Sequence, residues 1–430
     1  MSTLLLRRAF VLSAAAATVL GLAGLTAPAA QGRPAHHHHA TLYVSSQASA
    51  HHDHSRAAHR HGACNRAGYA TITSAVAAAS AGDTVVVCPG TYTEDVVVAK
   101  RLNLVGRHAT IDAAGLENAL QIVTSNVSVR GFVVRNANGE GILVGVDIPA
   151  DAPLLTSRVL THVRIDHVAA LNNNKGFNGT ENGNCKYAGD CGGGIHLNVT
   201  AWSSVRDSVV KGNADGILLT DDYGPAYRNL IEGNWVSDNP TECGIVLPSH
   251  NPGAVTYDQT TMAVTGRNPQ VGGVYDNVVR GNVTIANGTT KAPPEFGGGG
   301  SGSGIGLFGS GPGTGVYDNL VVGNYVALNG MAGFSIHAHL PGGEDLNGNR
   351  VVYNYFGKNN LGGEGFDGPP GPSDFQTTGI AVYSAPTVHM TISHNLIAHN
   401  EIGIWLSKTV TADGLASNAY VDVTTPVVTG

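Results

Sequence analysis

Charged and aromatic residues are scarce in this chain. Of its 430 residues, 13% are charged and 6% aromatic, and 24 lysines and arginines are outnumbered by 31 aspartates and glutamates. The formal net charge of -7 lacks the basic surplus of a nucleic-acid-binding protein, which excludes that class of partner. After residue 30, no segment approaches the roughly eighteen apolar residues of a transmembrane helix. We therefore expect no membrane insertion once the N-terminal segment is removed.

Glycine, by contrast, is abundant. The 58 glycines are too many for a helical bundle and lack the strict period of collagen. The hydrophobic share of 42% is too high for a disordered chain. A chain of this length could form two or three ordinary domains, or one elongated domain made of repeats.

Residues 1–30 are predicted to be a signal peptide. Arg7 and Arg8 precede an apolar, alanine-rich stretch over 9–25, and the small residues of 27–30 offer a cleavage site. The motif RRAFV also resembles the core of a twin-arginine signal, which would mean export after folding. We therefore expect a secreted, extracellular protein.

Residues 31–62 are predicted to be a histidine-rich linker without stable structure. Nine of the nineteen histidines lie between 31 and 61, four of them in the run His36 to His39. Imidazole clusters bind Zn, Cu or Ni. No fixed ligand spacing appears, so the alternative is a flexible linker that binds metal only adventitiously.

Five cysteines suit an exported protein. Cys64 and Cys88 flank the first predicted helix and strand and are predicted to form a disulfide. Cys185 and Cys191 lie in one loop and could close it with a second disulfide. Cys243 is left over beside a predicted strand, where we expect a buried thiol.

The main domain is predicted to span residues 63–430, with an N-terminal cap over 63–100. TITSAVAAAS (71–80) has the pattern of a short amphipathic helix, and GDTVVVCPGTYTEDVVV follows with strand patterns. A helix in this place would cover the first open coil of a repeat fold, and an uncovered sheet edge invites aggregation.

Repeats make up the rest of the chain. GVYDNVVRGNVTIANG (273–288) recurs as GVYDNLVVGNYVALNG (315–330), with weaker copies elsewhere. Each copy leads into a short strand of the form G-I-x-L; these strands begin at Gly141, Gly194, Gly216, Gly244, Gly304, Gly333, Gly379 and Gly403. Alternation places the I and L positions inside and their neighbours outside. Gly and Asn suit the tight bends between strands, and asparagines in successive coils can form a hydrogen-bonded ladder.

On these repeats the chain resembles the right-handed parallel β-helix proteins, which include pectate-lyase-like enzymes and periplasmic copper-site maturation factors of the NosD type. The resemblance covers about residues 65–425. It implies an all-β fold, a single-stranded right-handed parallel β-helix with a short N-terminal capping helix. The repeated residues are core and turn positions, so they specify the fold and not an activity.

Function is therefore expected on outward positions of the G-I-x-L strands. If the strands stack in register, the same position recurs about every 4.8 Å. The fifth position then reads Gly145, Asn198, Thr220, Pro248, Phe308, His337, Tyr383 and Ser407, and the seventh reads Asp147, Thr200, Asp222, His250, Ser310, His339, Ala385 and Thr409. Acid, hydroxyl and imidazole groups gather in the middle coils.

Within this run three motifs are predicted to carry the chemistry. Asp221 and Asp222 end a strand, where paired acids can bind Ca²⁺ or act as acid and base; the alternative is a solvated turn. His250 follows one coil later, with a plain turn histidine as the alternative. His337 and His339 should both face outward, and Glu344 and Asp345 come soon after them as substrate-binding candidates, together with Asn198.

Four long insertions interrupt the repeats near these strands, at 172–193, 251–272, 289–303 and 357–378. Loops on one side of a rigid solenoid often build the walls of a binding cleft. Among the aromatic residues, Tyr223, Trp202 and Trp235 could stack on sugar rings, whereas Trp405 on a terminal coil is expected to pack internally.

These features predict a carbohydrate-active enzyme acting on a polysaccharide, either a lyase or a glycoside hydrolase. For a lyase, Asp221 and Asp222 would hold Ca²⁺, and His250, His339 or Lys211 could be the base; an epimerase would use nearly the same groups. A hydrolase needs two carboxyls about 5 Å or roughly 6.5–9.5 Å apart. Motifs of polygalacturonases (G-H-G, R-I-K) are missing, and the catalytic arginine of pectate lyases is not recognisable, although Arg228 and Arg280 exist. The alternative is a non-catalytic binding or metal-site maturation factor, or a purely structural surface protein.

Overall fold

Parallel strands stacked into long sheets form nearly all of the structure. The computed structural model describes residues 39–47, 64–146, 155, 157–176, 193–290, 301–362 and 376–430. Residues 39–430 form one compact unit. Its strands form a 21-stranded sheet (sheet A), an 11-stranded sheet (sheet B), a five-stranded sheet (sheet C) and one antiparallel hairpin. The predicted signal peptide and the Cys185–Cys191 pairing lie outside the described residues.

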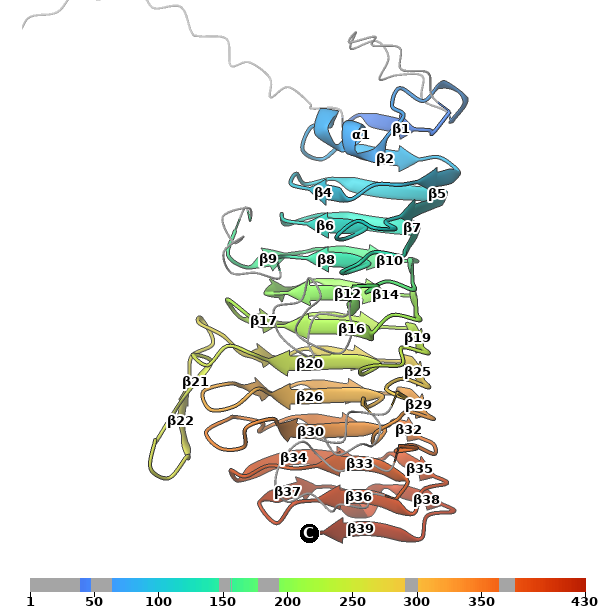
Figure 1. Cartoon of the computed structure of the whole chain (residues 1–430). Coiled ribbons are helices and arrows are strands. Elements are labelled where there is room, and N and C mark those ends of the chain that lie inside the picture. The colour runs from blue at the N-terminus through green and yellow to red at the C-terminus, as the bar shows by residue number, and fades with distance from the viewer. Residues whose placement is uncertain are drawn as a thin grey trace, which may run out of the picture. The chain divides into compact units, whose positions relative to one another are not determined.

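One coil contributes a strand to sheet B, a short strand to sheet C and two strands to sheet A. In the central coil these are β12 (Gly193–Asn198), β13 (Thr200–Ala201), β14 (Ser204–Arg206) and β15 (Val209–Lys211). The next coil begins with β16 (Asp215–Thr220), which pairs in parallel with β12. Repetition of this path gives the stack of coils seen in Figure 1. The predicted right-handed parallel β-helix is confirmed.

The remaining strands occupy equivalent places in the other coils. Sheet B also contains β4 (Val96–Val98), β6 (Leu120–Ile122), β8 (Ile142–Val144), β20 (Ile245–Ser249), β26 (Ile305–Gly309), β30 (Phe334–Ala338), β33 (Thr378–Val382), β36 (Ile402–Leu406) and β39 (Thr425–Thr429). Sheet C also contains β9 (Leu160–Thr161), β17 (Ala226–Tyr227), β23 (Val274–Tyr275) and β27 (Val316–Tyr317).

Sheet A is the longest because each coil adds two strands to it. Besides β14 and β15 it contains β1 (Thr41–Val44), β2 (Thr84–Val87), β3 (Gly90–Tyr92), β5 (Asn103–Asp112), β7 (Ser128–Arg135), β10 (Arg164–Asp166), β11 (Ala169–Leu171), β18 (Leu230–Glu232), β19 (Trp235–Ser237), β24 (Val278–Arg280), β25 (Val283–Ile285), β28 (Leu320–Val322), β29 (Tyr325–Ala327), β31 (Arg350–Val352), β32 (Tyr355–Phe356), β34 (Val388–Ser393), β35 (Leu396–Ala398), β37 (Val410–Asp413) and β38 (Ala419–Val421).

The register expected for the G-I-x-L strands is confirmed. Asn198 pairs with Thr220, and Phe308 lies between Pro248 and His337 on the neighbouring strands. The I and L positions point inward and are fully buried, as in Ile217 and Leu219. These inward columns form one continuous hydrophobic core along the solenoid. The outward positions of sheet B are consequently aligned coil over coil.

Asparagine ladders line three corners of the solenoid, as predicted. In one of them the amide Nδ2 of Asn234 donates to Oδ1 of Asn282 at 2.9 Å, and Asn282 donates likewise to Asn324 at 3.0 Å. The left-handed bend itself lies one residue earlier in these coils, at Gly233 and Gly281 with φ of 68° and 62°. The ladder asparagine satisfies the backbone of the turn, and the preceding residue supplies the bend.

The N-terminal cap contains the predicted helix, shorter than expected, as α1 (Ile72–Ala78). Thr71 caps its N-terminus by accepting a hydrogen bond from the Ser74 N–H, and the Lys100 ammonium donates to carbonyls at its C-terminal end. Ile72 and two further residues of α1 are buried against the first coil.

The strand β1 corrects the predicted linker boundary. Residues 41–44, which the sequence places in the histidine-rich linker, pair in parallel with β2 and so belong to the β-helix. Their alternating TLYV pattern buries Leu42 and Val44. The histidine run that precedes them lies almost entirely outside the described residues.

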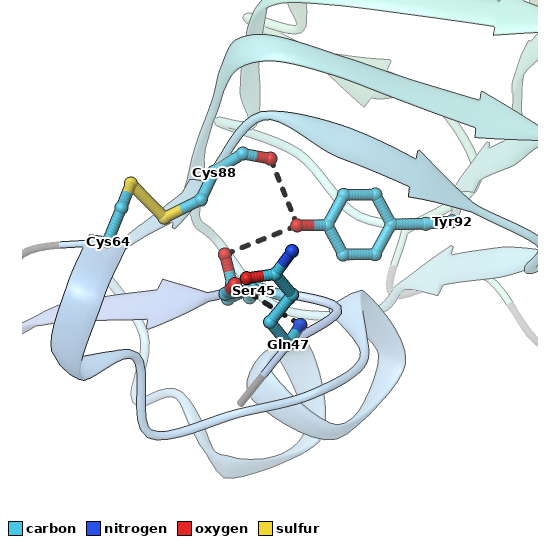
Figure 2. Close-up of a disulfide and its surroundings, with 6 residues drawn as sticks. Ser45, Gln47, Cys64, Cys88 and Tyr92 are labelled. Carbon is cyan, nitrogen blue, oxygen red and sulfur yellow. Dashed lines mark hydrogen bonds between the residues drawn. A yellow bond between two sulfur atoms is a disulfide. The ribbon is translucent and has the colours of Figure 1, made fainter. Parts of the chain in front are cut away.

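A disulfide between Cys64 and Cys88 joins this cap, as predicted. Figure 2 shows the Tyr92 hydroxyl beside it, 2.9 Å from the carbonyl oxygen of Cys88. Cys243 is buried and remains a thiol, whose sulfur accepts a hydrogen bond from the Ser303 N–H at 3.2 Å. No helix among the residues that the structure describes is long and apolar enough to cross a membrane.

Candidate functional site

A row of hydrogen-bonded polar side chains crosses the outward side of four neighbouring sheet B strands. It joins Glu140, His196, Thr220, Asp222 and His250, which belong to the coils of β8, β12, β16 and β20. The first three are at most 2% exposed, whereas the side chains of Asp222 and His250 are 21% and 19% exposed. This row of side chains therefore extends from the covered part of the sheet to a dyad, Asp222 and His250, that is accessible to solvent.

The dyad consists of Asp222 and His250. Asp222 follows the end of β16 and His250 follows the end of β20, so the two occupy the same position one coil apart. Asp222 Oδ1 lies 2.6 Å from His250 Nδ1. A carboxylate at this nitrogen holds the Nδ1–H tautomer, so the basic lone pair of the neutral ring lies on Nε2.

The second oxygen of Asp222 is held by residues of the adjoining strands. The amide Nδ2 of Asn198 donates to Asp222 Oδ2 at 2.5 Å and also to the carbonyl of Val146 at 2.9 Å. The Thr220 hydroxyl lies 3.4 Å from the same carboxylate oxygen. Both partners are fully buried, so the orientation of Asp222, and through it that of His250, is fixed by the sheet.

Tyr223 lies directly beside the dyad. Its hydroxyl oxygen accepts a hydrogen bond from the Val146 N–H at 3.3 Å, and its carbonyl accepts one from Arg158 Nε at 3.1 Å. The phenol passes over Gly145, where a Cβ would lie 2.7 Å from its hydroxyl oxygen. Gly145 also has a φ of 110°, so glycine is needed there both for the backbone and for the phenol.

Glu140 and His196 were missed by the sequence analysis. His196 Nδ1 lies 3.2 Å from Glu140 Oε1, and its Nε2 lies 2.9 Å from the Thr220 hydroxyl. His196 occupies the third position of its G-I-x-L strand, which alternation also places outward. Extending the positional comparison to that third position would have found it, because it is the lone histidine among mostly apolar residues there.

Asp221 does not share a site with Asp222, contrary to the predicted pair. Its carboxylate is fully buried and accepts hydrogen bonds from the Gly273 and His250 N–H groups and from the Ser249 hydroxyl, at 2.6, 2.7 and 2.9 Å. Burial raises the pKa of Asp221 to about 6, and the nearby His250 opposes this shift. The inward direction follows from alternation along the strand, so Asp221 stabilises the corner from inside.

The two aspartates do not fit a shared Ca²⁺ ion. Calcium takes six to eight oxygen ligands. The oxygens of Asp221 face backbone and hydroxyl donors, and those of Asp222 face Asn198 and His250. This donor arrangement satisfies each carboxylate separately, and calcium dependence stays a prediction.

His337 and His339 lie further along the solenoid, on β30 and just after it. His337 is buried; its ring stacks on His339 and contacts Phe308 at a tilted angle, with centroid distances of 5.3 and 4.3 Å. Burial, with a smaller effect of His339, lowers the pKa of His337 well below its usual value. His339 is exposed. The outward direction of both is confirmed by the register, and their catalytic role stays a prediction.

Glu344 and Asp345 are buried and have partners of their own. Glu344 Oε2 accepts from the Gly342 N–H at 2.5 Å, and burial raises the pKa of this carboxyl. Asp345 Oδ2 accepts from Arg267 Nε at 2.6 Å. These contacts tie the two acids to the corner beside β27 and β30, and a role in substrate binding stays a prediction for both.

Several other candidates lie on sheet A or its corners, away from the dyad. Lys211 pairs with Asp238 at 3.1 Å, and Arg280 pairs with Glu232 at 2.6 Å, both on outward positions of sheet A. Trp202 and Trp235 are 50% and 49% exposed, on the β13–β14 corner and on β19. Trp405 is buried at 4% exposure and packs with Ala332 and Ala381, as expected for a packing residue.

One of the four insertions is described in full and forms a projecting arm. Residues 251–272 contain the antiparallel strands β21 (Val255–Tyr257) and β22 (Val264–Arg267), which leave the side of the stack in Figure 1. Asn251 at its start donates from its backbone N–H to Asp221. Most of the other three insertions lies outside the described residues.

Comparison with known proteins finds similarity at the level of fold. No protein-family model and no curated protein sequence matches the chain. A Geobacillus virus E2 protein, ORF18, is 10% identical over 82% of this chain, with a TM-score of 0.44, and the chain spans 56% of that protein. The Azotobacter vinelandii mannuronan C-5 epimerase AlgE4 A-module is 14% identical over 83% of this chain and 91% of its own, with a TM-score of 0.43. The pectate lyase Pel9A is 12% identical over 88% and 79%, with a TM-score of 0.44.

These likenesses carry no assignment of activity. The class that the structure defines is a right-handed parallel β-helix protein with an aspartate–histidine dyad on the outer face of sheet B. Because one β-helix hosts many activities, the chemistry has to be argued from the dyad and its surroundings.

Proposed function

We propose that this protein is a secreted enzyme that cleaves a uronate-containing polysaccharide by β-elimination, with His250 as the general base. The observation that carries the proposal is the 2.6 Å contact between Asp222 Oδ1 and His250 Nδ1 at a partly exposed position. A buried network on the inner side of this contact holds the carboxylate in place. A base oriented in this way needs no movement before it can take a proton.

The elimination uses groups that the site supplies. His250 Nε2 takes the proton from the carbon beside the uronate carboxylate, and the electrons of that C–H bond form a C=C double bond. The glycosidic C–O bond to the neighbouring carbon breaks, and the leaving oxygen takes a proton from the imidazolium or from water. Asp222 stabilises the imidazolium that forms in between.

Hydrolysis has less support at this site. A glycosidase needs two carboxyls on opposite sides of the scissile bond. Asp222 is engaged with His250 and Asn198, and Asp221, the acid next to it, points into the core. The geometry therefore favours a histidine base over a carboxylate pair.

Export to an oxidising compartment is part of the proposal. It is supported by the Cys64–Cys88 disulfide, since disulfides persist mainly in secreted proteins, and by the signal-like residues 1–30.

The test is turnover of the mature chain on polygalacturonate, alginate and neutral polysaccharides, each with Ca²⁺ and with EDTA. Elimination produces unsaturated ends that absorb in the ultraviolet, and hydrolysis produces reducing ends without that absorbance. We expect absorbance with the wild type and none above background with His250→Ala. Reducing ends alone would replace the lyase by a hydrolase, and absorbance that survives His250→Ala would remove the dyad from the mechanism.

His339→Ala tests whether the active site lies at the dyad with His250 or at His337 and His339. Because His339 is exposed and lies two coils from His250, we expect this variant to keep turnover. Loss of turnover in His339→Ala but not in His250→Ala would place the active site at β30 instead. No product on any polymer would favour a non-catalytic binding or maturation factor.

A further inference from the structure

A concave surface lies on sheet A, on a different face from the dyad. It is a groove of about 820 Å³ over the outward side of β5, β7, β10, β14 and β18, within the size range of ligand-binding sites. Its floor is hollow because small polar residues alternate with larger ones: Ser128, Arg164 and Ser204 are register neighbours on consecutive strands. The short side chains on both sides of Arg164 leave its guanidinium exposed.

The groove is cationic on an acidic protein. Four arginines line it, against the two acids Asp166 and Asp207, while the whole chain has a net charge of -7; the arginines are Arg130, Arg164, Arg206 and Arg228. Asp166 is engaged with His167, whose Nδ1 lies 2.9 Å from its carboxylate. Such a local surplus of one sign attracts ligands of the other sign.

The four arginines differ in their acidic neighbours: Arg130 has Asp166 as its register partner on the adjacent strand, whereas Arg164 has a serine on each side. Arg206 and Arg228 have acidic partners, Glu232 and Asp276, each at 3.4 Å. For Arg130 and Arg164 the described part of the chain contains no ion pair, and both are exposed. Guanidinium groups bind carboxylates and sulfates through paired N–H donors, so these two are suited to anionic groups of a ligand.

Trp202 provides an apolar platform at the edge of the groove. It is 50% exposed and has a left-handed backbone with φ of 54°, although a bulky residue is disfavoured there. The equivalent corner of the other coils has His162, Arg228, Asp276 and Asp318, all with a left-handed backbone. The Arg228 guanidinium lies over the ring at 4.9 Å and orients it. The exposed ring at the edge of the groove offers an apolar face on which a sugar ring can pack.

We propose that this groove binds an anionic polysaccharide, with Arg130 and Arg164 on its acidic groups and Trp202 under a sugar ring. The inference deepens the proposed function, since it adds a holding site for the same acidic polymer on another face. It does not depend on the chemistry of His250. A chain held here would be retained on the solenoid between cleavage events.

The test is binding by the full mature chain in the His250→Ala background, which prevents consumption of the polymer. Affinity electrophoresis in gels with polygalacturonate, dextran sulfate or dextran gives apparent dissociation constants. We expect Arg164→Ala and Trp202→Ala each to weaken binding of polygalacturonate about tenfold, which is about 1.4 kcal/mol, because the first loses a charge-assisted contact and the second a stacked sugar ring. Added salt should weaken it further, and dextran should not bind.

Matched controls lie on the same sheet outside the groove. Arg350 is exposed and occupies the register column of Arg164 further along, between Leu320 and Thr391. Trp235 is 49% exposed, nearly the same as Trp202. Arg350→Ala and Trp235→Ala should bind polygalacturonate like the parent. Binding of dextran sulfate shows whether the groove accepts sulfate groups in place of carboxylates.

Two results would overturn the proposal: equal weakening in the control variants, or equal binding of dextran. Binding that depends on Arg164 while the wild type shows no turnover on any polymer would support the groove and remove the enzymatic proposal. Turnover by the wild type with unchanged binding in both groove variants would support the enzymatic proposal and remove the groove proposal.

Discussion

The corners of each coil differ in how much they vary from one coil to the next. Two of the three asparagine corners, at the two ends of the first sheet A strand of each coil, repeat nearly the same short bend, with amides hydrogen-bonded from coil to coil such as Asn234, Asn282 and Asn324. The third asparagine corner, between sheet A and the next sheet B strand, is interrupted by the insertions 172–193, 289–303 and 357–378. The corner after each sheet B strand changes length and content, from Asp222 and Tyr223 in one coil to the β21–β22 arm in the next. The two uniform corners maintain the stack. The corner after each sheet B strand, here called the variable corner, can therefore change without disrupting the stack and can carry functional residues.

The largest effect should come from Asp222→Asn at the variable corner. We expect kcat to fall about 10³-fold, because the amide cannot hold the Nδ1–H tautomer or stabilise the imidazolium. Steady-state absorbance assays measure the change. Asp238→Asn is the control, since Asp238 is 53% exposed and its carboxylate contacts Lys211 and the Ser237 hydroxyl on sheet A, away from the dyad. Turnover that persists in Asp222→Asn would contradict a role for this corner.

At a uniform corner, Asn282→Ala should reduce stability and leave turnover per folded molecule unchanged. The side chain makes buried hydrogen bonds to Ile231, Asn234 and Asn324, so we expect a loss of about 3 kcal/mol in the free energy of unfolding. Urea denaturation measures it. Asn103→Ala, at an exposed position of β5, should cost less than about 0.5 kcal/mol. A similar loss in both variants would mean that the ladder adds nothing specific.

The inner side of the variable corner predicts a pH effect. Burial raises the pKa of Asp221 to about 6, from 3.8, so the folded state binds this proton more tightly than the unfolded state. Its contribution to the free energy of unfolding is full below about pH 4 and falls by about 2–3 kcal/mol as pH rises through 6.

Urea denaturation of the wild type and of Asp221→Asn at pH 4, 5, 6 and 7 checks this. The difference between the two proteins, wild type minus variant, should decrease over that window. Asp238→Asn should show no such trend, and a constant difference for Asp221→Asn would refute the assignment.

The smallest effect should come from Gly145→Ala, which disturbs the dyad only through its neighbour. A Cβ there would lie 2.7 Å from the Tyr223 hydroxyl and 2.8 Å from the Asn198 carbonyl oxygen. We expect kcat/KM to fall about tenfold, with a stability loss of roughly 1–2 kcal/mol from the left-handed backbone. Gly115, with φ of 78° and nothing within 4 Å, is the control for strain alone. Equal activity in both variants would exclude Tyr223 from the site.

Much of the site could be predicted from the repeats. The G-I-x-L alignment correctly placed Asn198 beside Thr220 and Asp222 beside His250, because a period of two and a fixed coil leave one register that buries the apolar positions. The same alternation places Asp221 inside and Asp222 outside, because neighbouring residues of a strand point to opposite sides. The predicted pairing of the two acids was therefore inconsistent with the strand pattern. His196 was missed because only the fifth and seventh positions of the G-I-x-L strands were compared, and not the third, which also points outward.

The sequence alone determined the solenoid, its register, the asparagine ladders and the Cys64–Cys88 disulfide, because each follows from local periodicity or from nearness along the chain. Only the tertiary structure decided which outward groups are covered and which meet. It buried His337 and exposed His339, joined Glu140 to His196, and gathered Arg130, Arg164 and Trp202 into one groove. Such contacts connect side chains from different coils, and their solvation depends on neighbours that no single repeat contains.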